Sequence, residues 1–178
     1  MRKTLIFISF FVIVGVLVGS AALYTSIKYP IKYQDLVTKY SAEYSLDKNL
    51  VASLINEESS FNKDSVSSKG ACGLMQITPS TAKFICQELG QEYEKSNLFV
   101  PEKNIEYGCF YLNYLRKKFV DEKVYLSAYN AGESTVRLWL NDSSNSKDGV
   151  TLYKIPYNGT SEYVNKIIDG KKMYQGRF

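Results

Sequence analysis

The chain of 178 residues contains no histidine. This absence excludes Ser-His-Asp and Cys-His nucleophile sites, zinc sites with histidine ligands, and histidine acid–base chemistry. Any catalysis must therefore use carboxylates, tyrosine, lysine, cysteine or backbone groups.

A large excess of one charge is also absent. The 22 basic and 18 acidic residues give a formal net charge of only +4, whereas a nucleic-acid-binding protein concentrates far more basic charge on one face. We therefore expect no nucleic-acid partner. Internal repeats and low-complexity linkers are missing too, and a hydrophobic fraction of 45% excludes wholesale disorder. Length and composition predict one globular domain with at most a small extra segment.

Charge is missing from residues 4–27, which follow Arg2 and Lys3. As a helix, residues 5–24 would be about 30 Å long, the thickness of a hydrocarbon core. A cleaved signal peptide has an apolar region of only about 7–15 residues, so the segment favours an uncleaved transmembrane anchor over residues 1–27. The positive-inside rule then places residues 28–178, as one domain, on the extracytoplasmic side. The alternative is cleavage after the small residues 19–21, which would give a secreted protein.

Gly15 and Gly19 form a G-x-x-x-G pattern inside this apolar segment. Such a pattern brings some membrane helices together, although glycine is common in these helices in any case. A weak homodimer through this face is a secondary hypothesis.

The three cysteines, Cys72, Cys86 and Cys109, are an odd number for a protein outside the cytoplasm. Cys86 and Cys109 each share a helical face with apolar residues, so we interpret both as small buried hydrophobic residues. A disulfide between them, which an oxidising compartment would allow, is the minority hypothesis.

The rest of the chain reads as one helix after another, and no segment alternates as a strand ladder would. Asp47, Thr78 and Thr160 are expected N-caps. Residues 62–77 are expected to form a loop, and residues 170–178 a frayed basic tail. Apolar spacing predicts helices over residues 34–44, 48–59, 79–89, 102–119, 124–131 and 134–140, with a last helix starting at the Thr160 cap. The predicted fold class is therefore mostly α.

One carboxylate falls on the apolar face of the helix predicted over residues 48–59. At about 100° per residue, Glu58 points the same way as the apolar residues, and Glu57 points about 90° away, towards solvent. Burial and the C-terminal end of a helix both raise the pKa of such a carboxyl group. A carboxyl group that stays protonated near neutral pH can act as a general acid. In the alternative, structural interpretation, Glu58 accepts hydrogen bonds from the next loop and only holds the fold.

The loop that follows carries Gly-Ala-Cys-Gly-Leu-Met-Gln at residues 70–76. Two close glycines let the backbone approach a ligand, but no lysine follows in a P-loop pattern, so a phosphate site is not indicated. Gln76 places an amide among apolar residues, and amides and aromatic rings are groups that bind sugars. The 15 tyrosines suit a sugar site, although most of them are expected to fill the core.

Several stretches resemble, in order, the motifs of the SLT-type lytic murein transglycosylases, which are relatives of goose-type lysozyme. The similarity covers about residues 33–170. The stretches are Glu-Ser-Ser-Phe-Asn at residues 58–62, Ser67 with residues 70–82, residues 104–112, Ala-Tyr-Asn-Ala-Gly at residues 128–132, and Ile-Pro-Tyr at residues 155–157 with Thr160, Tyr163 and Val164.

This resemblance implies a lysozyme-like helical domain of the α+β superfamily, with a groove for peptidoglycan glycan strands, behind one N-terminal transmembrane helix. It implies that Glu58 is the sole catalytic acid. It also implies a set of substrate-binding residues in the groove: Ser67, Gly73, Met75, Gln76, Tyr129 and Asn130. No metal and no cofactor are expected, and the domain would lie outside the bacterial cytoplasmic membrane.

The chain departs from the family pattern at Gly159, where a glutamate that helps to bind the sugar is common. Glu162 is near in sequence, but its place on the expected helix gives no reason to treat it as a substitute. Sugar binding at this position is therefore expected to differ from that of the family.

Retaining and inverting glycosidases normally use two carboxylates at set separations, whereas here only Glu58 lies inside a motif. The resemblance therefore implies a lyase that cleaves the bond between N-acetylmuramic acid and N-acetylglucosamine without water and leaves a 1,6-anhydro end. The alternatives are a lysozyme-like hydrolase of the same bond and a wall-binding module without activity.

Overall fold

Helices make up nearly all the regular structure of the described chain. The computed structural model describes the backbone of residues 2–178 and the side chains of residues 13–20 and 22–178. Within these residues, the extended pairings are two isolated antiparallel bridges that join Cys72 to Val66 and to Ile77. The prediction of a mostly α fold is confirmed. The elements are α1 (Arg2–Lys28), α2 (Gln34–Glu43), α3 (Lys48–Ser59), α4 (Pro79–Leu89), the 3₁₀ helix η1 (Lys95–Phe99), α5 (Pro101–Lys118), α6 (Glu122–Ala131), α7 (Glu133–Leu140) and α8 (Asn158–Tyr174).

Capping residues set several of these boundaries. The Asp47 side chain accepts a hydrogen bond from the Asn49 backbone N–H at 2.8 Å and begins α3. The Thr78 hydroxyl accepts from the Thr81 N–H at 3.1 Å, and Pro79 is the first residue of α4. Such caps satisfy donors that the first turn of a helix leaves free. The helices predicted between residues 34 and 140 are confirmed, with ends that differ by about two residues.

Two predictions for the last helix are wrong. Thr160 does not cap it, because α8 begins at Asn158 and the Thr160 hydroxyl instead donates to Asn130 Oδ1 at 2.8 Å. Residues 170–178 are not a frayed tail, because α8 continues to Tyr174, whose ring is fully buried. The short helix η1 was not predicted, since five residues are too few for a periodic pattern.

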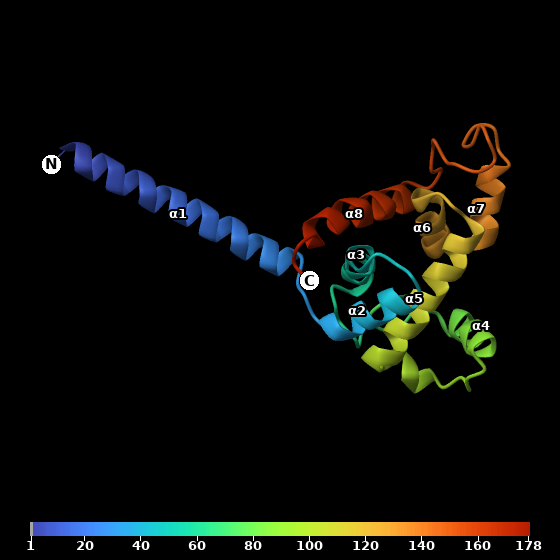
Figure 1. The fold of residues 1–178 in the computed structure, drawn as a ribbon. Coiled ribbons are helices and arrows are strands. Elements are labelled where there is room, and N and C mark those ends of the chain that lie inside the picture. Colours follow the sequence, from blue (N-terminus) through green and yellow to red (C-terminus); the bar gives the residue numbers. More distant parts are fainter. Residues whose placement is uncertain (1) are drawn as a thin grey trace.

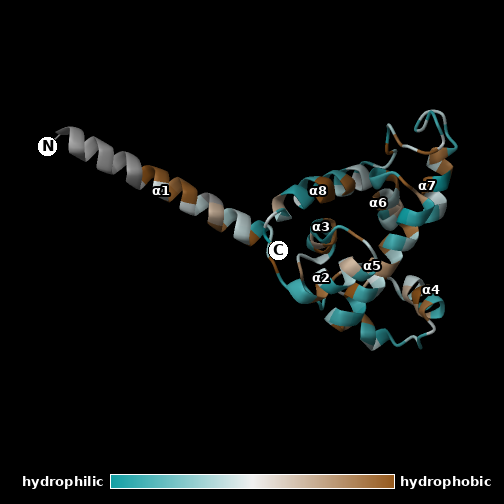
Figure 2. Cartoon of the chain, in the orientation of Figure 1, coloured by the Kyte–Doolittle hydropathy of each residue, from teal (hydrophilic) through white to brown (hydrophobic). Residues whose placement is uncertain are grey.

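α1 leaves the helical body as a long rod, with the N-terminus at its far end (Figure 1). Its described side chains are mostly hydrophobic in the middle of the rod (Figure 2). Among the residues with described side chains, no helix has the length and apolar content that crossing a membrane requires. The predicted anchor covers residues 1–27. Of these, Met1 and the side chains of residues 2–12 and 21 lie outside the described residues.

α3 runs through the middle of the body and packs along α8 (Figure 1). The Ser53 hydroxyl of α3 donates to the Ile167 carbonyl oxygen of α8 at 2.7 Å. The helices approach closely at Gly170, where an added Cβ would collide with Ser53 Oγ. This packing fixes the end of α3, which carries Glu58, relative to α8.

All three cysteines are free and buried. The minority hypothesis of a bridge between Cys86 and Cys109 is therefore wrong, and the interpretation of both as buried hydrophobic residues is confirmed. The Cys86 thiol donates to the Tyr107 hydroxyl at 3.4 Å.

The C-terminus closes over the segment that joins α1 to α2. The Tyr174 hydroxyl donates to the Pro30 carbonyl oxygen at 3.1 Å, and Arg177 donates to that of Tyr29 at 2.8 Å. The rings of Tyr29 and Tyr174 meet edge to face, with centroids 5.9 Å apart. These contacts hold the start of the globular body against its last helix.

Tyr174→Ala should lower the free energy of unfolding of the full-length chain by about 3–5 kcal/mol, because it removes a fully buried ring. Tyr174→Phe loses only the hydrogen bond to Pro30 and should cost about 1 kcal/mol. Urea unfolding followed by circular dichroism measures both changes. Small and equal losses would show that the tail does not contribute to the core.

Candidate active site

Glu58 lies in the last turn of α3, where α3 meets α8. The hydroxyl of Tyr163, on α8, donates a hydrogen bond to Glu58 Oε1 at 2.6 Å. The Glu58 side chain is half-buried, as its place on the apolar face of the helix predicts. None of the ion pairs in the described part of the chain includes it. The acid is therefore held by a hydroxyl and not by a cation.

Burial is the main cause that raises the pKa of Glu58 to about 7. The hydrogen bond from Tyr163 acts in the other direction, because it favours the carboxylate, and the charge of neighbouring Glu57 raises the pKa further. Since burial outweighs the hydrogen bond, a large share of Glu58 keeps its proton near neutral pH. That is the protonation state a general acid requires.

Glu57 points to a different side of α3, as the helical spacing predicts. Lys166 of α8 places its Nζ 2.9 Å from Glu57 Oε1, in an ion pair. Two adjacent glutamates therefore have different partners, a cation for Glu57 and a neutral hydroxyl for Glu58.

Asn104 of α5 holds the loop after α3 in place. Its Oδ1 accepts from the Met75 N–H at 2.7 Å, and its Nδ2 donates to the carbonyl oxygens of Cys72 at 2.9 Å and Leu98 at 2.8 Å. The side chain is fully buried, so these bonds satisfy an amide that has no access to water. Sequence reasoning missed this role. The available signal was an asparagine in the first turn of a helix, beside a buried isoleucine.

Gly73 and Met75 lie on the buried side of this loop. Gly73 has a φ of 78°, and a Cβ there would collide with the Asn104 amide and a backbone carbonyl. The Met75 side chain is fully buried against Gly108. Its carbonyl oxygen accepts a hydrogen bond from the Tyr129 hydroxyl at 2.8 Å. In this structure both residues shape the loop, and their predicted contact with sugar stays a prediction.

Gln76, Tyr129 and Asn130 line one pocket of about 260 Å³. A second pocket, of about 300 Å³, shares Thr81 and Tyr111 with the first. Because the two pockets share walls, they form one groove. We call it the aromatic groove, and its main lining residues are Gln76, Thr81, Phe84, Tyr111, Tyr114, Tyr129, Asn130 and Glu133. The structure thus brings three of the predicted site residues together.

Tyr129 connects the aromatic groove to Glu58. Burial raises the pKa of Tyr129 well above its ordinary value, and the nearby Glu58 charge adds to this effect. Burial likewise raises the pKa of Tyr163. Both tyrosines near the acid are therefore neutral. Tyr163 donates its hydrogen bond to Glu58, and Tyr129 donates to the Met75 carbonyl oxygen. Ser67 lines neither pocket, and its hydroxyl oxygen accepts from the Ala71 N–H at 3.1 Å to close its own turn.

Glu133 is a second carboxylate on the aromatic groove, and it has cationic partners. Lys118 Nζ and Arg137 Nη2 each lie 2.8 Å from its oxygens. Burial raises the pKa of Glu133, but these two cations outweigh burial and lower it below the ordinary value. Glu133 is therefore a charged group, in contrast to Glu58. In the described part of the chain, no three acidic or cysteine side chains are grouped so that they could hold a metal ion.

The position of Gly159 is open. A Cβ built on Gly159 would meet no atom within 4 Å. Glu162 lies along a different pocket, with Glu57 and Lys166, and does not line the aromatic groove. The structure therefore gives no reason to name Glu162 as a substitute for the missing carboxylate, and the effect of Gly159 on sugar binding stays a prediction.

Comparison with known proteins identifies the family. Residues 35–151 match the model of the transglycosylase SLT domain. The chain is 34% identical over 145 residues to the soluble lytic murein transglycosylase of Salmonella typhimurium. This alignment covers 79% of this chain and 22% of that protein. It is 31% identical over 167 residues to the membrane-bound lytic murein transglycosylase C of Histophilus somni. That alignment covers 81% of this chain and 46% of the relative.

Solved structures agree with this match. The 70-kDa soluble lytic transglycosylase of Escherichia coli has a TM-score of 0.76 at 27% identity, over 88% of this chain and 26% of that chain. The lytic transglycosylase Slt of Pseudomonas aeruginosa, an inactive mutant with glutamine in place of one glutamate, has a TM-score of 0.75 at 27% identity, over 85% of this chain and 25% of that chain.

The fold and the site therefore define a transglycosylase-type domain. The chain belongs to the transglycosylase SLT domain family, and the predicted family is confirmed. It spans less than half the length of these relatives.

Gly73→Ala should lower the free energy of unfolding by more than about 2 kcal/mol, because it adds left-handed backbone strain and a collision with Asn104. Gly70→Ala is the matched control. Gly70 has a similar φ of 76° but open space around it, so this variant should cost only about 1 kcal/mol. Urea unfolding of both variants measures the difference, and equal losses would contradict the close approach at Gly73.

Glu58 should make the protein less stable as the pH rises. Its folded-state pKa of about 7 lies above the ordinary 4.5, so the folded chain binds this proton more tightly than the unfolded chain. The stabilisation is complete below about pH 4.5 and is lost as the pH rises through about 7. Relative to wild type, the free energy of unfolding of Glu58→Gln should therefore rise by on the order of 3 kcal/mol between about pH 4 and pH 8. Urea unfolding at both pH values tests this, and a difference that does not change with pH would refute it.

Proposed function

We propose that this chain is a lytic transglycosylase that cleaves peptidoglycan glycan strands between N-acetylmuramic acid and N-acetylglucosamine. The observation that carries the proposal is Glu58, a half-buried acid whose pKa is raised to about 7 and whose hydrogen-bond partner is a tyrosine hydroxyl. Membership of the transglycosylase SLT domain family supports it.

In the proposed mechanism, Glu58 first donates its proton to the glycosidic oxygen, and the bond from that oxygen to C1 of N-acetylmuramic acid breaks. Tyr163 donates to Oε1, so Oε2 is the oxygen that carries the proton. The 2-acetamido group or the ring oxygen of the sugar takes up the positive charge. The Glu58 carboxylate then removes the proton from the C6 hydroxyl, whose oxygen attacks C1 and closes a 1,6-anhydro ring. No water is consumed, and Glu58 ends protonated, as it began.

A single carboxyl group can fill both roles because its pKa lies near neutral pH. Tyr163 assists the second role, since its hydrogen bond is stronger to a carboxylate than to a carboxylic acid. Glu133, whose pKa is lowered by its cationic partners, is not suited to donate a proton.

The aromatic groove suits a glycan strand. The rings of Tyr111 and Tyr114 stack at 6.0 Å and offer a face for the C–H groups of a sugar. The Gln76 Nε2 already donates to the carbonyl oxygens of Ser65 and Gly73, so the Gln76 amide offers its oxygen as an acceptor. Asn130 Oδ1 already accepts from Thr160, so the Asn130 amide offers its nitrogen as a donor. Tyr129 joins this surface to the acid.

We also propose that the apolar N-terminal segment anchors the domain outside the cytoplasmic membrane. Residues 4–27 carry no charge and follow Arg2 and Lys3. The full-length chain should stay with the membrane fraction after alkaline carbonate washing. Release into the soluble fraction at full length would contradict an anchor, and a shortened soluble product would support signal cleavage. The pairing of two chains through Gly15 and Gly19 stays a prediction.

Glu58→Gln should reduce product release from purified peptidoglycan by about 10²–10⁴-fold, because it removes the proton donor but keeps the shape of the side chain. Mass spectrometry of the digest measures the products. Those of the wild-type chain should be lighter by one water than hydrolysis products, since the 1,6-anhydro ring forms without water.

Each alternative gives a different result. Products that contain the added water would indicate a lysozyme-like hydrolase. Equal release by wild type and Glu58→Gln would refute the role of Glu58. Binding to peptidoglycan without any product would indicate a wall-binding module.

A further inference from the structure

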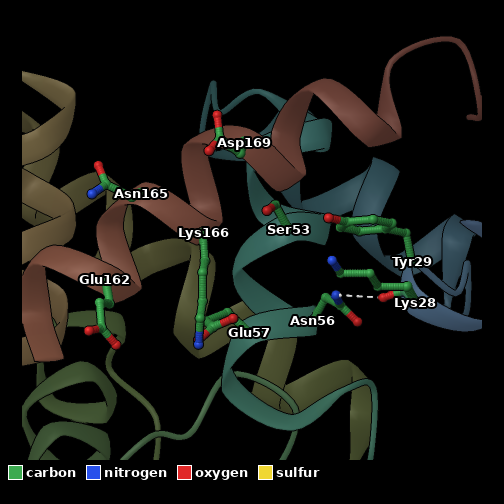
Figure 3. A pocket seen from close by; sticks show the side chains of 9 residues that line it. All are labelled: Lys28, Tyr29, Ser53, Asn56, Glu57, Glu162, Asn165, Lys166 and Asp169. Atoms are coloured by element: carbon green, nitrogen blue, oxygen red, sulfur yellow. Dashed lines mark hydrogen bonds and ion pairs between the residues drawn. The ribbon is translucent and has the colours of Figure 1, made fainter.

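The base of α1 is fixed to the globular body by hydrogen bonds. The Asn56 side chain of α3 donates from Nδ2 to the Lys28 carbonyl oxygen at 3.1 Å (Figure 3). The carbonyl oxygen of the next residue, Tyr29, accepts from the Arg177 guanidinium at 2.8 Å. Figure 1 accordingly shows the C-terminus beside the base of α1. We call this place, where three distant parts of the chain meet, the joint.

The joint is surrounded by basic side chains that have no acidic partner. Lys28 is exposed at the end of α1, and Lys32 is exposed a few residues further on. Lys48, the first residue of α3, places its ammonium 5.7 Å from the centroid of the Phe178 ring, next to Arg177. None of the ion pairs of the described residues includes any of these cations. We call the four residues the basic rim: Lys28, Lys32, Lys48 and Arg177.

Acidic residues near the joint leave the basic rim with a net positive charge. Asp47 and Asp169 already form ion pairs with two lysines of α8 that are outside the rim. Glu162 lies away from Lys28, at the other end of the pocket drawn in Figure 3. Asp35 and the carboxyl group of the last residue offset two of the four charges of the rim. A partner with several negative charges would therefore meet net attraction here.

The proposed anchor places the basic rim at the depth of lipid headgroups. Lys28 is four residues beyond Tyr24, the end of the apolar segment, which is about 6 Å along a helix. Headgroups form a layer about 5–8 Å thick on each side of the hydrocarbon core. The rings of Tyr24 and Tyr29 lie on either side of the Lys28 ammonium, at 5.4 and 5.5 Å, and such aromatic rings are typical of membrane surfaces. Because Arg177 is bound to Tyr29, the rim lies in this layer or directly beside it.

The aromatic groove lies on another side of the body. Its walls come from α4, α5, α6 and α7, and Figure 1 shows α4 and α7 far from the base of α1. A body that rests on a membrane through the basic rim therefore leaves the groove open. Asn56 ties the joint to α3, the helix that carries Glu58, so the orientation of the joint also sets that of the acid.

We propose that the basic rim binds the anionic headgroups of phospholipids, so that the body rests on the membrane surface in one orientation. The inference rests on the proposed membrane anchor and is independent of the proposed cleavage. An anionic lipid surface attracts lysine and arginine side chains that lie close to it, and each one strengthens the contact by about 5-fold. The cations of the rim are available for this contact because no acidic side chain of the described residues holds them in an ion pair.

Acetylation of lysines in the full-length chain, inserted in lipid nanodiscs, tests this contact. A lysine covered by headgroups reacts more slowly with acetic anhydride, and mass spectrometry of the peptides measures its rate. Lys48 should react at least about 10-fold more slowly in nanodiscs that contain phosphatidylglycerol than in nanodiscs of phosphatidylcholine alone, since several cations act together.

Lys147 is the matched control within the same chain. Its ammonium also lies over an aromatic ring, 5.6 Å from the centroid of Tyr153, and it forms no ion pair among the described residues. It belongs to the loop between α7 and α8, which Figure 1 places far from α1. Lys147 should therefore react equally fast in both kinds of nanodisc.

Lys32→Gln should reduce the protection of Lys48 by about 5-fold, the share of one cation. Lys154→Gln makes the same charge change on another exposed lysine without an ion pair in the described part of the chain, but in the loop between α7 and α8. This variant should keep the protection. Higher ionic strength should weaken the protection, because salt screens charges at a surface.

Equal acetylation of Lys48 in the two kinds of nanodisc would overturn the inference, and so would equal effects of Lys32→Gln and Lys154→Gln. Soluble polyphosphate might act on the same cations, so it is added to the chain in phosphatidylcholine nanodiscs. Protection of Lys48 as strong as that by phosphatidylglycerol would assign the rim to a free polyanion and would also overturn the inference.

Size-exclusion chromatography tests the anchor separately. A chain that does not co-elute with phosphatidylcholine nanodiscs would refute the anchor, and the inference with it. A chain that co-elutes but leaves Lys48 unprotected by phosphatidylglycerol would overturn the inference alone. The proposed cleavage of peptidoglycan stands in either case.

Discussion

The hydrogen bond between Tyr163 and Glu58 joins the two helices on which the site depends. α3 and α8 are far apart in sequence, and their packing removes Glu58 from water. The same contact supplies a neutral hydroxyl where a lysine or arginine would have held the acid in its charged form. The raised pKa of Glu58 is thus a consequence of helix packing, and a small residue such as Gly170, which lets the helices approach, contributes to it from a distance.

The same helix pair separates two adjacent carboxylates. Because successive residues of a helix point about 100° apart, Glu58 reaches Tyr163 while Glu57 reaches Lys166. Glu58 thus adjoins Tyr129 and the aromatic groove, whereas Glu57 lines a different pocket together with Glu162 and Lys166. Asn104 completes the site from α5, since its buried amide fixes the loop whose Met75 carbonyl positions Tyr129. The hydrogen bond from Tyr163 therefore ties α8 to the Glu58 end of α3, and those from Tyr129 and Met75 tie α6 and α5 to the loop after α3.

Much of this arrangement could be predicted from the sequence, because it rests on local signals. Asp47 and Thr78 mark helix starts, and the helical spacing places Glu58 and Glu57 on different faces. What the sequence could not supply depends on contacts between distant residues. The partner of Glu58, the buried role of Asn104 and the inward packing of Tyr174 all arise from tertiary structure. Thr160 shows how a local signal can mislead, since its hydroxyl is used by Asn130 and not by the helix that it was expected to cap.

The central claim is that Glu58 keeps its proton near neutral pH, and its titration tests this most directly. In the full-length chain with ¹³C-labelled glutamate side chains, the Glu58 carboxyl resonance is identified as the one that Glu58→Gln removes. The account predicts that this resonance titrates with a pKa of about 7. A titration near the ordinary glutamate value of 4.5 would contradict the account, because the acid would then be ionised before it could donate a proton.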